Sequence, residues 1–202
     1  MTTDNAFVEH SARRLVITLP RPYDAACEHF ETLVPEADLA RFYQLGSWNA
    51  TRELAEINGP HGFIQYYRSD VCALMAGSPS LWKATQYLIG NHIIAERAFR
   101  ADASVVLHAP LPALIYADPD GDTKLVVDQP SLLFDSYDNP EIAEIGRELD
   151  ASLAQLITLL GGDVPAQLSA SATASIPRHE DGEPLARVTD GHTTGRQRAR
   201  LG

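Results

Sequence analysis

The sequence predicts an α+β domain: a small antiparallel sheet with helices packed on one face. Three observations lead to this prediction. Short segments rich in β-branched residues recur, as in RLVITL at residues 14–19 and TKLVV at residues 123–127. The turn DPDGD at residues 118–122 is typical of a hairpin loop. An apolar residue recurs every third or fourth position after Asn139, which predicts a long packing helix that ends at Gly161-Gly162.

The first half of the body contains two expected helices and a second strand. After Pro22, an apolar face predicts a helix over Tyr23–Leu33 with Asp24 as its cap. A further amphipathic helix is expected over residues 50–57. The segment FIQYYRSDV at residues 63–71 alternates as a strand should.

The middle of the chain gives weaker signals. Apolar residues over 81–100 predict a helix that Gly90-Asn91 either kinks or divides into two shorter helices. The segment 105–117 is strand-like but contains two prolines, which cannot donate to a ladder of backbone hydrogen bonds. We therefore expect an edge strand there, or a strand entered through a bend.

Composition excludes several classes of protein. The chain has 202 residues and 45% hydrophobic residues, which suits a globular protein, and only two cysteines, too few for a disulfide scaffold. Its net charge of -11 argues against nucleic acid as a partner. The chain contains no apolar run of about 18 residues, so no membrane span is predicted. Its first residues do not have the pattern of a secretory signal. The expected location is cytoplasmic.

The chain divides into three predicted parts. Residues 1–13 form an N-terminal extension, residues 14–165 a single α+β domain, and residues 166–202 a tail. The tail lacks aromatic residues and spaces its apolar residues, Leu168 among them, too widely for a helix or strand face. It is therefore expected to be disordered, and a chain ending at Pro165 is expected to fold.

Nucleotide-binding and hydrolase motifs are absent, and the histidines are the residues of interest. His61, His92 and His108 lie on a predicted turn, helix and strand, so they could converge, although no spacing marks a metal site and none is predicted. His92 has Glu96 four residues on, close enough for a buried acid–base pair or a surface ion pair. Its apolar surroundings also allow haem ligation.

Residues 87–131 resemble the central part of the domain of unknown function 302 family. The matching features are a helical Asn, an apolar-Pro strand, a Tyr with an acidic hairpin, and an Asp-x-Pro close. They fall at Asn91, residues 107–110, residues 116–121 and residues 128–130. Many members have Cys where this chain has Leu111, so no role of that Cys is carried over.

The resemblance extends more weakly over most of residues 14–160, and simpler members lack the insert around residues 36–58. It implies the order β-α-β(4)-α with this helical insert, similar to the TATA-binding-protein-like arrangement, and a sheet that often pairs into dimers. It supplies no catalytic residue, and a fold does not define a function.

The leading functional hypothesis is a protein that binds a small molecule between the helix at 82–100 and the strands at 63–71 and 105–117. Apolar walls with a few polar groups are typical of ligand sites. The alternatives are a homodimeric interaction protein and a haem protein or haem-dependent enzyme that uses His92. The candidate pocket residues are Tyr66, Tyr87, Asn91, His92, Glu96, His108 and Tyr116.

Overall fold

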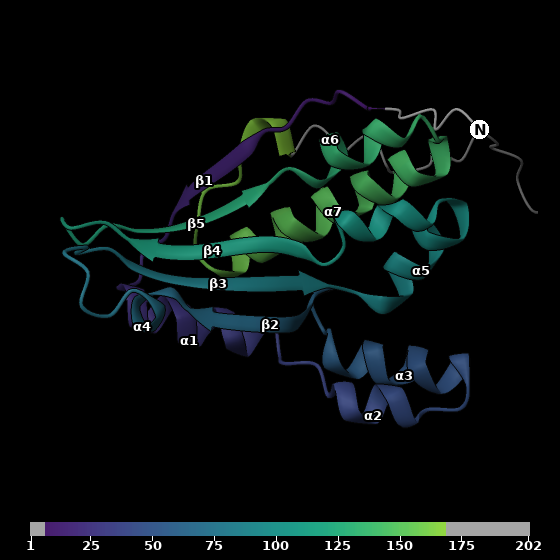
Figure 1. Ribbon diagram of the computed structural model, residues 1–202, viewed down its shortest axis with the longest axis horizontal. Helices are drawn as coiled ribbons and strands as arrows, with labels where there is room; N and C mark the ends of the chain where they lie inside the picture. The colour runs from purple at the N-terminus through teal and green to yellow at the C-terminus, as the bar shows by residue number, and fades with distance from the viewer. Residues whose placement is uncertain (1–6, 169–202) are drawn as a thin grey trace, which may run out of the picture.

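The computed structural model describes residues 7–168, which form one five-stranded antiparallel sheet with helices on one face (Figure 1). The sheet order is β1-β5-β4-β3-β2, and every neighbouring pair is antiparallel. The strands are β1 (Arg14–Thr18), β2 (Ile64–Asp70), β3 (Lys83–Gly90), β4 (Leu111–Ala117) and β5 (Thr123–Asp128).

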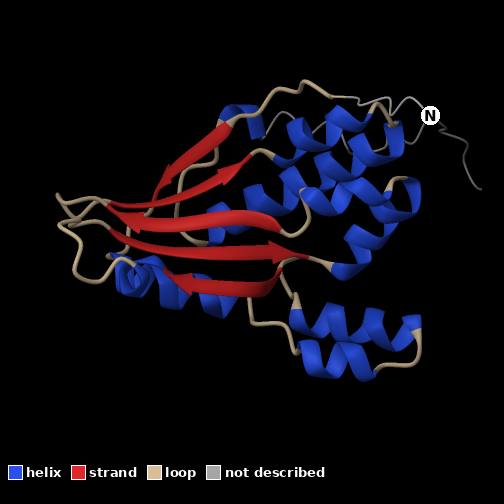
Figure 2. Cartoon of the chain, viewed as in Figure 1, coloured by secondary structure: helices blue, strands red, loops and turns tan. Residues whose placement is uncertain are grey.

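Seven α-helices lie between residues 23 and 159. Helices are drawn in blue in Figure 2. They are α1 (Tyr23–Leu33), α2 (Leu39–Gln44), α3 (Trp48–Asn58), α4 (Val71–Leu74), α5 (His92–Ala101), α6 (Pro130–Phe134) and α7 (Pro140–Leu159). Two 3-10 helices, η1 (Ala103–Leu107) and η2 (Asp135–Tyr137), complete the set. The predicted α+β class and antiparallel sheet are confirmed, with α2 and α3 as the helical insert. The expected order β-α-β(4)-α holds for the strands and the flanking helices, but α4 and α5 separate β2, β3 and β4 along the chain.

One face of the sheet forms the main core. Along β4, Leu111, Ala113 and Ile115 are buried, whereas the residues between them are more exposed, because successive side chains of a strand point to opposite faces. The inward residues join Phe30 of α1 and Leu153 of α7 in a single cluster. The second face of the sheet is turned toward the viewer in Figure 1, and no helix of the described residues crosses it.

The predicted helix over 81–100 is wrong in its first half. Residues 83–90 form β3, and only α5, which begins at His92, is helical. Thr85, Tyr87 and Ile89 are buried at every second position, which is the period of a strand. Asn91 lies at the division as the cap of α5, where its Oδ1 accepts a hydrogen bond from the Ile93 N–H at 2.9 Å.

For residues 105–117 the sequence allowed an edge strand or a strand entered through a bend, and only the second is correct. The first part of this segment is η1, and β4 begins at Leu111, after a bend that contains a cis peptide bond between Ala109 and Pro110. The strand is thus entered through a bend, as one alternative stated. It is the central strand of the sheet and not an edge.

Two smaller differences concern the first half. The cap of α1 is Pro22, with no side-chain hydrogen bond, so Asp24 does not cap that helix. Helix α2 was not predicted, because its six residues are too few to show a helical period. The capping predicted for α7 is confirmed, since Asn139 Oδ1 accepts from the Glu141 N–H at 2.9 Å.

The expected tail begins inside the described residues. Leu168 is fully buried and belongs to the main core cluster. Leu168 therefore packs with the domain, whereas residues 169–202 of the expected tail lie outside the described residues. Among residues 7–168 no helix is long and apolar enough to cross a membrane.

Close packing of α7 on α6 makes Gly146 a sensitive position. A Cβ there would lie 2.9 Å from Ser131 Cα and 2.8 Å from Phe134 Cβ. We expect Gly146→Val to lower the free energy of unfolding by about 1–3 kcal/mol through overpacking, measured by urea denaturation. The control is Gly46→Val, since a Cβ at Gly46 has no neighbour within 4 Å. Equal stability of the two variants would contradict the packing described.

Candidate functional site

Three segments converge where β3 ends and α5 begins. The first segment is Gly90, the last residue of β3, together with the first turn of α5. The second is the start of β2, and the third is the bend Ala109–Pro110 that precedes β4. Figure 1 shows β3 running directly into α5, with the insert helices α2 and α3 beside the start of β2. This corner of the fold lies close to the position that the sequence predicted for a pocket.

An irregularity in β2 frees Tyr66 from the sheet. The register runs Gln65 with Ile89 and then Tyr67 with Leu88, so Tyr66 is an extra residue opposite the β3 ladder. A bulge of this kind bends a strand and redirects a side chain. The simple alternation expected for residues 63–71 therefore fails at Tyr66.

Tyr66 and Phe42 hold the imidazole of His92 on two sides. The Tyr66 hydroxyl lies 2.5 Å from His92 Nδ1. The Phe42 ring stacks on the imidazole with ring centroids 4.2 Å apart and an interplanar angle of 24°. Phe42 comes from α2, so the insert contributes directly to this arrangement. The His92 side chain is thus held in one orientation.

Burial sets the protonation of this pair. It raises the pKa of Tyr66, and a hydrogen bond from the His92 backbone lowers it by less, so the phenol remains protonated at neutral pH. Burial also lowers the pKa of His92 below its ordinary value, so the imidazole is neutral. The structure offers the Tyr66 hydroxyl no acceptor within residues 7–168 other than Nδ1. When the hydroxyl donates to Nδ1, the hydrogen of the neutral imidazole lies on Nε2.

A pocket of about 170 Å³ opens beside this pair. None of its lining residues carries a formal charge, and four of them are Gly, Ala or Pro. The lining consists of Tyr66, Gly90, Asn91, His92, Ala95, Ala109 and Pro110. A smaller compartment of about 20 Å³ adjoins it on the core side, where Leu111 and Phe134 join the wall. An apolar cavity of about 150 Å³ holds a benzene molecule, so the pocket suits a compact ligand.

Three of the seven candidate residues meet at this pocket: Tyr66, Asn91 and His92. Asn91 contributes to the wall while its side chain caps α5 and donates to the Gly62 carbonyl at 3.3 Å. Glu96 does not pair with His92, because its carboxylate lies 2.9 Å from Arg100 Nε on the surface of α5. The acid–base pair expected from their spacing is therefore not formed.

The other three candidates lie elsewhere. Tyr87 points into the core, where its hydroxyl donates to Glu31 at 2.9 Å and burial raises its pKa. His108 follows η1, with its ring centroid 5.8 Å from that of His10. Tyr116 is on the outer face of β4, with its ring centroid 5.6 Å from that of Trp82. The structure describes no cluster of three metal-ligating side chains in residues 7–168, so His61, His92 and His108 do not converge.

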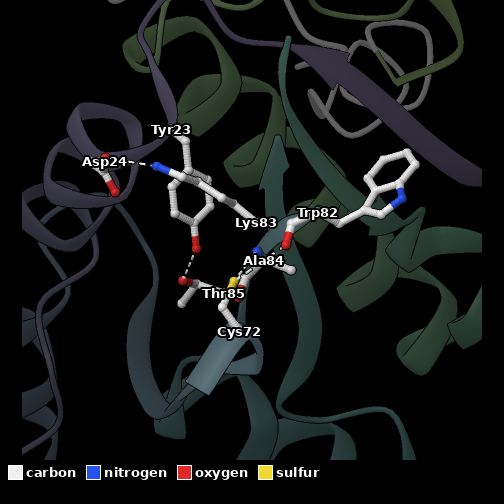
Figure 3. Close-up of polar contacts among 7 residues, drawn as sticks. All are labelled: Tyr23, Asp24, Cys72, Trp82, Lys83, Ala84 and Thr85. Atoms are coloured by element: carbon white, nitrogen blue, oxygen red, sulfur yellow. Dashed lines mark hydrogen bonds and ion pairs between the residues drawn. The ribbon is translucent and has the colours of Figure 1, made fainter. Parts of the chain in front are cut away.

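A second polar cluster joins α1 and α4 to the start of β3 (Figure 3). The Ala84 N–H donates to Cys72 Sγ at 3.1 Å, and the Tyr23 and Thr85 hydroxyls are 2.6 Å apart. Lys83 Nζ lies 3.3 Å from Asp24 Oδ2, so Asp24 anchors a strand instead of capping its helix. These contacts join α1 and α4 to the sheet, and they place the Cys72 thiol against the backbone of β3.

Sequence reasoning missed the small residues of the pocket and Phe42. Gly90, Ala95, Ala109 and Pro110 carry no functional group that a motif could reveal, although the break at Gly90-Asn91 marked the place. Phe42 is 50 positions from His92 in the sequence, and only the packed insert brings the rings together.

The fold and the site define an α+β protein. Its antiparallel sheet is covered by helices on one face, and a small apolar pocket lies at the end of β3. The sequence model described as "Domain of unknown function DUF302" matches residues 70–160. This match includes residues 87–131, whose resemblance to the same family was noted in the sequence.

A solved structure has a fold similar to that of this chain. The crystal structure of an uncharacterised conserved DUF302 protein from Bacillus stearothermophilus superposes with a TM-score of 0.54 at 15% sequence identity. The match covers 73% of this chain and 97% of that one, and at this identity it supports the fold alone. No curated protein matches the chain.

Proposed function

We propose that this protein binds a small molecule in the pocket at the junction of β3 and α5. The observation that carries the proposal is the oriented His92–Tyr66 pair beside an otherwise apolar and uncharged wall. Ligand sites commonly combine apolar walls with a few placed polar groups. The size of the pocket and the burial of His92 favour this function over haem binding.

The test compares the wild-type chain with a variant whose pocket is filled. In Ala95→Leu, a larger side chain enters the wall, whereas the control Ala101→Leu makes the same change at an exposed position of the same helix. Native mass spectrometry of protein from its own host should detect a retained small molecule that Ala95→Leu loses and Ala101→Leu keeps. If no molecule is retained and a metabolite screen also finds no binder, the proposal fails.

We infer a second candidate function, self-association through the open face of the sheet. Val16, Tyr67 and Trp82 are about half exposed on or beside this face, at 52%, 49% and 53%. Val16 lies on β1 and Tyr67 on β2, which are the two edge strands, so a partner that covers both side chains would span the sheet. A second copy packed face to face would cover these side chains.

Light scattering at a protein concentration of tens of micromolar tests this candidate. A dimer with an interface of standard size should stay associated at that concentration. We expect a dimer that Leu114→Glu, on the outer face of β4, converts to a monomer. Ala40→Glu adds the same charge at an exposed position of α2 and should leave the dimer intact. A wild-type monomer would end this candidate and leave the pocket proposal untouched.

A further inference from the structure

We propose that the ligand is an uncharged, ring-sized molecule with one hydrogen-bond acceptor, which the Nε2–H of His92 recognises. This inference rests on the proposed function and names the class of molecule that the same pocket takes. It follows from three properties of the site: its volume, its lack of charged side chains and the oriented imidazole of His92.

The volume limits the ligand to one small ring with short substituents. The pocket holds about 170 Å³, and the adjoining compartment of about 20 Å³ has room for about one water molecule. The wall on the bend side is formed by Ala109 and Pro110, which are short and stiff.

The absence of charged groups in the wall excludes an ionic ligand. None of the seven lining residues is Lys, Arg, Asp or Glu. The nearest carboxylate along α5, that of Glu96, is already paired with Arg100. A charged ligand would lose its hydration and gain no counter-charge, which costs more than an apolar contact returns.

The donor is the Nε2–H of His92. We assign the Tyr66 hydroxyl as the donor to Nδ1, which places the hydrogen of the neutral imidazole on Nε2. Nε2 hydrogen bonds to no group of residues 7–168. The donor is also pre-oriented, because Phe42 covers one face of the ring and Tyr66 holds one edge. A fixed donor loses little side-chain entropy when the ligand binds. A molecule with an acceptor at its edge is therefore preferred over the same ring without one.

Benzene and pyridine make a matched pair of probes, since they differ mainly in one ring nitrogen acceptor. We would titrate both into the full chain by NMR, at a pH where pyridine is uncharged, with N-methylpyridinium as the charged probe. Both neutral rings should bind, and N-methylpyridinium should not. In His92→Phe the ratio of pyridine affinity to benzene affinity should fall about threefold to tenfold, the value of one neutral hydrogen bond.

The wild-type protein supplies a readout that does not depend on the variant's folding. Pyridine should shift the 15N and 1H signals of His92 Nε2–H, whereas benzene should leave them nearly unchanged. If both rings bind, Ala95→Leu blocks both, and neither the affinity ratio nor the Nε2 signal responds to the acceptor, the ligand class is wrong and the binding function stands. Binding of N-methylpyridinium as tight as that of benzene would also overturn the class. If no probe binds the wild-type chain, the binding function falls as well.

Discussion

Asp150→Ala should lower the free energy of unfolding by about 2–6 kcal/mol, because two buried donors would lose their acceptor at about 1–3 kcal/mol each. Asp150 is fully buried in α7. Its carboxylate accepts hydrogen bonds from Gln129 Nε2 at 2.8 Å and from the Ser131 N–H at 2.9 Å. These bonds join α7 to the start of α6 and the end of β5. Urea denaturation would measure the loss.

Glu144→Ala is the matched control on the same helix. Glu144 pairs with Arg147 at the surface, and such pairs contribute little, so its loss should cost less than about 0.5 kcal/mol. If the two variants lost the same stability, the buried carboxylate would not be the clamp described.

A chain that ends at residue 165 should melt at least about 4 °C below one that ends at residue 168. Leu168 is fully buried against the main core, and losing a buried Leu costs about 2–5 kcal/mol. For a domain of this size, 1 kcal/mol shifts the midpoint by about 2–4 °C. Differential scanning calorimetry of both chains would measure the difference.

Leu168→Ala in the full-length chain separates the side chain from the cut itself. We expect it to account for most of the difference between the two truncated chains. Equal midpoints for the chains ending at 165 and 168 would instead support the boundary expected from the sequence, at Pro165.

Local signals were sufficient for much of the fold. Helix α7 was predicted correctly because Asn139 and Pro140 are strong start signals and the apolar period is long. The hairpin between β4 and β5 was predicted because Asp and Gly favour its turn. Both signals lie within the element that they specify, so no knowledge of the tertiary contacts was needed.

The segment 83–101 shows where local signals fail. In KATQYLIG the buried residues alternate, but neighbouring apolar residues at 82, 88, 89 and 93 also satisfy a helical period. The decisive signal is Asn91, which can cap a new helix as well as interrupt an old one. Tertiary pairing with β2 and β4 then selects the strand.

The candidate site was predicted in part for the same reason. His92 and Asn91 follow a break that the sequence makes visible, and Tyr66 was assigned to a neighbouring strand. The bulge that turns Tyr66 toward His92, and the stacking of Phe42, depend on pairings between distant segments. Tyr87, His108 and Tyr116 were included because their residue types suit a pocket, but the pleat and the bend direct them elsewhere.

The crystal structure of the full chain grown with pyridine tests the central claim most directly. We predict a ring in the pocket between Ala109 and His92, with its nitrogen about 2.7–3.2 Å from His92 Nε2. The Tyr66 hydroxyl should remain on Nδ1, and Phe42 should remain stacked on the imidazole. An empty pocket at saturating pyridine, or a ring bound elsewhere while His92 turns away from it, would contradict the account.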